Sequence, residues 1–119
     1  MSDIVQLSWI SWSTEGKRLP LRTVNLSNVE TVGVYVIWHS GQKPRVVRVG
    51  QGDIAERLRC HREDSCVLAY EVYGQLFVTW AAVPARLVDG VERYLAEYWK
   101  PLVGDRFPQV GPIAVNSPF

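Results

Sequence analysis

The sequence predicts an α/β domain of the α+β type, with a small, mostly antiparallel sheet flanked by helices. Three runs rich in β-branched and aromatic residues, at 31–38, 45–49 and 75–83, have the composition of strands. Two stretches with helical periodicity, at about 54–62 and 84–100, follow the second and third runs. The fold class therefore rests on this order of strand and helix signals.

Length and composition indicate one soluble domain. The chain has 119 residues, with 47% apolar and 21% charged residues, which is enough for one core and too little for two. We expect a core at 31–118 and an N-terminal extension at 1–30. The sequence has no apolar run long enough for a membrane helix and its start lacks a secretory pattern, so we expect a cytoplasmic protein. Cys60 and Cys66 are expected to be ordinary reduced thiols.

The first part of the chain is expected to run along the edge of the core. Residues 4–12 partly alternate apolar and polar side chains, which predicts a half-buried strand. Residues 15–17 form a turn signal, and the stretch to Asn28 has no sustained period, so it is expected to be a surface connection. Trp9 and Trp12 are the two tryptophans that could stack on bases rather than serve only as anchors.

The runs at 31–38 and 45–49 are expected to form an antiparallel hairpin. If Trp38 pairs with Arg45, Tyr35 lies opposite Arg48. Opposed residues of an antiparallel pair point to the same face of the sheet, and a slip by one pair keeps both on that face. The hairpin therefore predicts that Tyr35 and Arg48 share one face.

The first helix is predicted from its cap and its period. Asp53 is a favourable N-cap, and Glu56 three residues later completes a pair typical of a capping box. On a helix at 54–62, Ile54 and Leu58 form the apolar stripe. Arg57 and His61 are four residues apart and share one face.

The second half of the chain contains a buried strand and a longer helix. The run at 75–83 is almost continuously apolar, as in a central strand, and residues 67–73 could pair beside it. Pro84 opens a helix to about Lys100, and Pro101 ends it. Its expected core-facing residues are Leu87, Val91, Tyr94, Leu95 and Tyr98. The tail is expected to be an ordered loop that wraps back on the domain.

Several short motifs occur in an order that resembles the GIY-YIG nuclease superfamily. The sequence has a glycine-aliphatic-tyrosine strand and then an aliphatic-glycine strand end, in which arginine stands where the family has its second tyrosine. A helix with arginine and histidine, a later helix glutamate and a late asparagine follow. The matching positions are Gly33-Val34-Tyr35, Arg48-Val49-Gly50, Arg57, His61, Glu92 and Asn116.

The resemblance implies metal-dependent hydrolysis of DNA phosphodiester bonds, with Mg²⁺ or Mn²⁺ and without an organic cofactor. It makes Glu92 the metal ligand, and magnesium often uses only one or two carboxylates because it keeps several waters. Without the resemblance, Glu92 could instead complete a helix cap that begins at Asp89, because the two residues have N-cap to N3 spacing.

The resemblance also assigns roles to the other matching residues. Arg57 would clamp the scissile phosphate, which suits a planar and permanently charged guanidinium. Tyr35 would act as general base, with Arg48 supplying the positive charge that a phenolate needs; alternatively, Tyr35 is a half-buried strand aromatic. His61 could position water, donate to a phosphate or finish its helix. Asn116 would brace the site.

Local charge supports nucleic-acid binding in spite of a net charge of +1. Between 43 and 62 the local charge is +4, from two acidic residues and six basic ones: Lys43, Arg45, Arg48, Arg57, Arg59 and Arg62. The same charges could form a solvated hairpin tip and helix face. Three functions therefore stay open: a nuclease, a catalytically inactive nucleic-acid-binding module on the same fold, and a protein-interaction domain.

Overall fold

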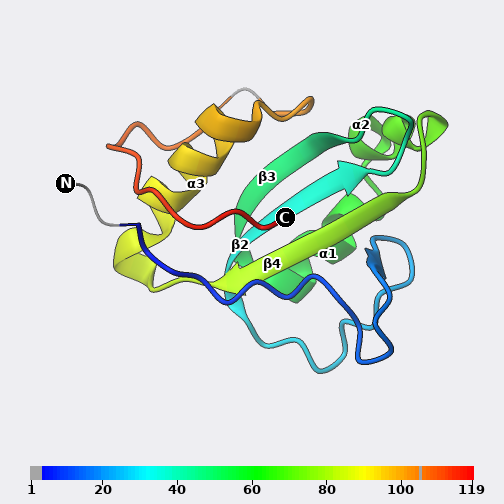
Figure 1. Cartoon of the computed structure of the whole chain (residues 1–119), viewed down its shortest axis with the longest axis horizontal. Coiled ribbons are helices and arrows are strands. Elements are labelled where there is room, and N and C mark those ends of the chain that lie inside the picture. Colours follow the sequence, from blue (N-terminus) through cyan, green and yellow to red (C-terminus); the bar gives the residue numbers. More distant parts are fainter. Residues whose placement is uncertain (1–3, 105) are drawn as a thin grey trace.

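A computed structural model describes residues 4–104 and 106–119. Four antiparallel strands form one sheet in the order β1-β4-β2-β3, and three α-helices flank it (Figure 1). The predicted α+β class is confirmed at this level. The elements are β1 (Leu19–Pro20), β2 (Val32–His39), β3 (Arg45–Asp53), α1 (Ile54–His61), α2 (Ser65–Leu68), the 3₁₀-helix η1 (Ala69–Val72), β4 (Leu76–Ala82) and α3 (Ala85–Trp99).

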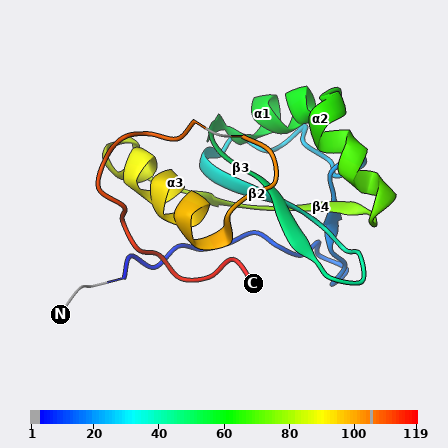
Figure 2. The same ribbon diagram turned by 90° about the horizontal axis from the view of Figure 1, so that it is seen from above.

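The sheet separates two apolar layers. Helices α1 and α2 lie on one side of it and α3 on the other (Figure 2). On one face, Tyr35 and Ile37 of β2 pack with Ile54 and Leu58 of α1. On the other face, side chains of β2 and β3 pack with α3 and with both terminal segments; this layer includes Val34, Val36, Val49, Val91, Leu95, Leu7 and Val115. Because both faces are covered, the central strands β2 and β4 are almost wholly buried.

The β2–β3 hairpin forms as predicted, but its register differs from the expected one. Arg45 pairs with His39 rather than with Trp38, and a bulge follows between Ile37 and Trp38. Beyond the bulge Arg48 lies opposite Ile37, and Tyr35 lies opposite Gly50. The extra residue of a bulge shifts every later pair along the strand. Tyr35 and Arg48 are therefore diagonal rather than directly opposed.

Helices α1 and α3 begin where the sequence signals place them. The Asp53 side chain accepts a hydrogen bond from the Glu56 backbone N–H at 3.1 Å, and Ile54 and Leu58 are fully buried. Pro84 precedes the first turn of α3, and Lys100, in the left-handed conformation, ends it. Tyr98 was expected to face the core but is 62% exposed, and its ring stacks on Tyr94, which is partly buried against the core.

Two expected strands do not form. Residues 67–73, which could have paired beside β4, belong to α2 and η1, because the Asp64 side chain caps α2 by accepting from the Cys66 N–H. Residues 4–12 make only isolated bridges, in which Val5, Ile10 and Trp12 pair with Val115, Trp80 and Arg18. Ile10 exchanges two hydrogen bonds with Trp80 of β4, and Leu7 is the buried residue of this segment, so the segment lies along the edge of the sheet without forming a strand.

The segment after α3 covers the outer edge of β3. The N–H groups of Leu102 and Val103 donate to the carbonyls of Val46 and Val47, at 3.2 and 2.8 Å. The tail then returns past α3 to meet the N-terminal segment, as expected for an ordered loop (Figure 1). Within the described parts of the chain, none of the helices has the length and apolar character that a membrane crossing requires.

Candidate functional site

The tyrosine of the first motif lies in the interior. Tyr35 is fully buried in the middle of β2, and its hydroxyl group is 2.6 Å from Nε2 of His61, at the end of α1. His61 is also buried, and its Nδ1 is 3.6 Å from a carboxylate oxygen of Asp64, beyond hydrogen-bond distance. Strand β2 and helix α1 thus hold a phenol and an imidazole as a hydrogen-bonded pair.

Two arginines lie close to this pair. Arg48 projects from β3 and Arg57 from α1, and the charge of each guanidinium acts to lower the pKa of Tyr35. The Nε atoms of both arginines are buried and have no hydrogen-bond partner, and neither side chain forms an ion pair with the described residues. Buried donors of this kind are rarely left unsatisfied. Together they form a cationic position suited to an anion.

A buried carboxylate lies on α3, the helix that packs on the opposite face of the sheet from Tyr35 and α1. Glu92 of α3 is buried, and its Oε2 accepts a hydrogen bond from Nε2 of Gln51 at 2.6 Å. The same amide nitrogen donates to Asp89 at 2.7 Å. Burial raises the pKa of Glu92, whereas the hydrogen bond and the charges of Arg48 and Arg57 act to lower it. Glu92 therefore lies within electrostatic reach of both arginines.

Sequence reasoning missed Gln51 and Asp89 as site residues. Asp89 lies inside α3, which begins at Ala85, so it does not cap a helix that contains Glu92. The capping alternative for Glu92 is therefore wrong. One signal was available for Gln51, a polar residue placed between two glycines directly after an apolar strand. Its role depends on the approach of α3 to β3, which no local pattern specifies.

The buried pair favours its neutral forms. Burial raises the pKa of Tyr35 by more than the two arginine charges lower it. Burial, together with the same charges, lowers the pKa of His61, while Asp64 acts in the opposite direction. In the neutral pair the Tyr35 hydroxyl donates to Nε2, which leaves the proton of His61 on the unpartnered Nδ1. The positive charge that would favour a Tyr35 phenolate is present, but the burial of Tyr35 disfavours the phenolate more strongly.

The burial of His61 predicts a pH dependence of stability. Because its pKa is lowered on folding, the unfolded chain binds more protons between this lowered value and the ordinary value of 6.5. We expect the free energy of unfolding to rise with pH across this window. His61→Gln should remove that contribution, as measured by urea unfolding at several pH values.

Asp64→Asn provides the matched comparison. The asparagine side chain can still cap α2, but it no longer raises the pKa of His61. We expect the window to extend to lower pH in this variant. An unchanged pH profile in both variants would contradict the assignment of the slope to His61.

Asn116 and part of the basic cluster have structural roles. The Asn116 side chain accepts from the Leu7 N–H at 2.6 Å and donates to the Leu7 carbonyl at 3.0 Å, so it ties the tail to the N-terminal segment. Arg62 donates to the carbonyls of Leu21 and Val24 in the loop after β1. Arg62 is therefore bound within the fold, and Arg48 and Arg57 are the basic residues whose charges act on Tyr35.

The aromatic residues singled out in the N-terminal segment also have partners in the structure. Trp9 donates through its indole nitrogen to the carbonyl of Asn116. Trp12 is 54% exposed, and the Arg18 guanidinium lies 4.2 Å from the centre of its ring. Trp9 thus serves as an anchor of the tail, and Trp12 forms a cation–π pair.

The carboxylates are compatible with a magnesium-type ion. No group of three or more histidine, cysteine, aspartate or glutamate side chains is arranged for a metal among the described residues. Magnesium does not need such a group, since one or two carboxylates suffice when water and phosphate oxygens supply the rest. Glu92 and Asp89, joined through Gln51, provide this donor set.

Comparison with known proteins adds no assignment. No protein-family model, curated protein or solved structure matches this chain. The chemistry of the site therefore has to be judged from its own residues. Two arginines and a phenol–imidazole pair lie near one another, and a buried carboxylate of α3 lies within electrostatic reach of both arginines.

Proposed function

We propose that this chain is a GIY-YIG-like nuclease that cleaves DNA phosphodiester bonds with Mg²⁺ or Mn²⁺. The observation that carries the proposal is the pair of buried, unpartnered Nε atoms of Arg48 and Arg57 near Tyr35. The buried carboxylate of Glu92, on the helix that covers the other face of the sheet, lies within electrostatic reach of both arginines. Phosphodiester hydrolysis needs charge stabilisation on the phosphoryl oxygens, a positioned water and a proton acceptor. This group of side chains can supply each of these.

The two arginines would bind the scissile phosphate. A guanidinium stays charged at every accessible pH and donates parallel hydrogen bonds to phosphate oxygens. Arg48 occupies the position of the family's second tyrosine, and it cannot accept a proton there. Its role in this chain is therefore electrostatic, directed both at the phosphate and at Tyr35.

The Tyr35–His61 pair would accept the proton of the attacking water. Tyr35 holds its own proton at neutral pH, so it can accept another only as that proton passes to His61 across the 2.6 Å contact. Glu92, with Asp89 beside it, would hold the divalent ion, which supplies Lewis-acid stabilisation of the phosphoryl oxygens. Gln51 would keep the two carboxylates in position.

The test is nicking of supercoiled plasmid by the pure protein with Mg²⁺ or Mn²⁺, with Glu92→Ala as the inactive control. The second candidate is a nucleic-acid-binding module without turnover. It is favoured by the arginine at the second motif and by the burial that raises the pKa of Tyr35. DNA binding without Glu92-dependent nicking would support this second candidate.

DNA binding by this site should depend on Arg57 more than on Arg59. Both are on α1, but the Arg57 charge acts on Tyr35, whereas the Arg59 side chain is exposed to solvent. We expect Arg57→Ala to weaken binding to unrelated DNA sequences equally. The slope of log affinity against log salt concentration should fall by about the amount that one phosphate contact contributes. Fluorescence anisotropy at several salt concentrations measures both effects.

Arg59→Ala is the matched control, because it removes the same charge two residues away. It should change the affinity less than Arg57→Ala does. If the two variants bind equally and both keep the wild-type salt dependence, phosphate binding at this site is excluded, and the protein-interaction alternative becomes the better explanation.

A further inference from the structure

A second feature lies on the same face of the sheet as Tyr35. A groove of about 670 Å³ separates the tip of the β2–β3 hairpin from η1. Six of the side chains that line it are His39, Lys43, Arg45, Tyr70, Tyr73 and Leu102. We call it the hairpin groove. None of its lining residues is acidic, so it combines aromatic rings with two positive charges.

The aromatic side of the hairpin groove is a stack of rings. Tyr73 stacks on His39, with ring centres 5.5 Å apart, and on Tyr70, with centres 6.0 Å apart. Even so, 62% of Tyr73 is exposed, and Val72 beside it is 80% exposed. Gly41 packs so closely on the backbone of Tyr73 that an added Cβ would lie 2.2 Å from its carbonyl oxygen. The hairpin tip and η1 are therefore fixed relative to each other.

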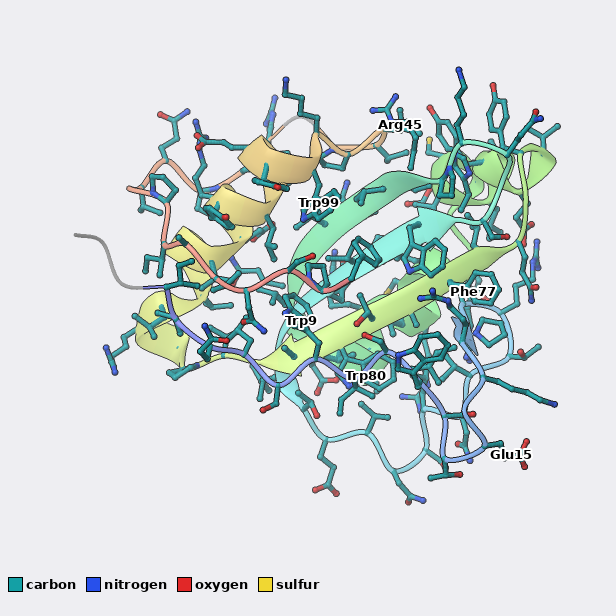
Figure 3. All side chains as sticks on the ribbon, in the orientation of Figure 1. Trp9, Glu15, Arg45, Phe77, Trp80 and Trp99 are labelled. Atoms are coloured by element: carbon teal, nitrogen blue, oxygen red, sulfur yellow. The ribbon has the colours of Figure 1, made fainter. Side chains whose placement is uncertain are left out.

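The charged side of the hairpin groove is available to an anion. Lys43 and Arg45 are exposed and form no ion pair with the described residues. Arg45 lies beside the loop after α3 and donates to the carbonyl of Lys100 (Figure 3). The nearest acid on η1, Glu71, is bound by Arg22 through two hydrogen bonds of 2.7 and 2.8 Å. Its charge is thus compensated.

The hairpin groove and the candidate active site lie along the same two strands, although no residue of the site lines the groove. His39 and Tyr35 are four residues apart on one face of β2, which corresponds to about 13 Å along a strand. The segment that begins at Leu102, on the wall of the groove, leads to Gly104, where the Arg48 guanidinium lies against the backbone. A flexible strand whose phosphate is bound by Arg48 and Arg57 can therefore continue into the groove.

We propose that the hairpin groove binds unpaired nucleotides of the DNA strand that flanks the scissile phosphate. Aromatic rings stack on bases of any sequence, and cations follow the phosphates; this combination is typical of sites for single strands. In a duplex the base faces are covered by their neighbours, so the rings would have nothing to stack on. The substrate class that follows is DNA with a single-stranded or branched flank. This inference rests on the proposed function for the position of the cleaved bond.

The test measures binding without cleavage. A fluorescein-labelled oligothymidylate of about 12 nucleotides is titrated with the Glu92→Ala protein, and anisotropy gives Kd. We expect Tyr73→Ala to weaken binding about tenfold, Tyr73→Phe to retain it, and Lys43→Gln to reduce its salt dependence. A duplex of equal length should bind Tyr73→Ala and the parent protein alike.

Tyr98→Ala is the matched control, because Tyr98 is also 62% exposed but lies on α3, outside the groove. An unchanged Kd for Tyr73→Ala, or an equal loss in Tyr98→Ala, would overturn the inference. Failure of the proposed function has a different signature. In that case the plasmid stays intact in the presence of metal, while the oligothymidylate still binds in a manner that depends on Tyr73.

Discussion

Glu92→Ala is expected to lower metal-dependent plasmid nicking by at least ~10²-fold, the lower range for the loss of one preorganised electrostatic group. Glu92 is a buried carboxylate on which the charges of Arg48 and Arg57 both act, and it accepts a hydrogen bond from Gln51. The rate of conversion from supercoiled to open-circular plasmid, measured with Mg²⁺ and with Mn²⁺, tests this expectation.

Glu92→Gln separates activity from folding. The amide has almost the same shape and no charge, and burial already favours the uncharged form of Glu92 by raising its pKa. We therefore expect this variant to be at least as stable as the wild type at neutral pH and still inactive. Activity of the wild type should also fall on acidification at a higher pH than for an ordinary carboxylate.

Glu97→Ala is the control on the same helix. Glu97 is exposed and pairs with Arg93 at 2.7 Å, a surface ion pair of small energetic value. It should nick plasmid at the wild-type rate. Wild-type activity in Glu92→Ala would disprove the metal role of Glu92, and with it the proposed mechanism.

Gly50→Ala is expected to destabilise the fold and disrupt the site together. An added Cβ would lie 2.1 Å from the hydroxyl oxygen of Tyr35 and 2.3 Å from its Cζ. The ring cannot move aside easily, because it is fully buried and bound to His61. Such overpacking costs about 1–3 kcal/mol, which corresponds to a loss of about 5 °C or more in Tm for a domain of this size.

Two comparisons make the Gly50 result specific. Gly111→Ala should be neutral, because no atom lies within 4 Å of its added Cβ. Combining Gly50→Ala with Tyr35→Phe should recover part of the stability, since removal of the hydroxyl relieves the closest contact. Thermal unfolding followed by circular dichroism measures each variant. Equal Tm values for Gly50→Ala and the wild type would contradict the packing described for Tyr35.

The elements with local signals were predictable from the sequence. Asp53 determines the start of α1 because its side chain accepts a hydrogen bond from the free N–H of Glu56. Pro84 marks the start of α3, since its fixed φ suits the residue at a helix start. The β-branched run of β2 and the apolar run of β4 identify strands by composition alone. The strand predicted at 67–73 was wrong. The composition of these residues allows a strand, whereas the cap at Asp64 favours a helix.

Some features of the candidate site were likewise predictable from the sequence, and others were not. The sequence by itself determined that Tyr35 and Arg48 share a face of the sheet and that Arg57 and His61 share a face of a helix, because both follow from fixed periodicities. The tertiary structure alone decided the bulge that moves Arg48 to a diagonal position, the link through Gln51 between Asp89 and Glu92, and the structural use of Asn116. These depend on how close two elements come in space, and that distance is set by the packing of the whole core.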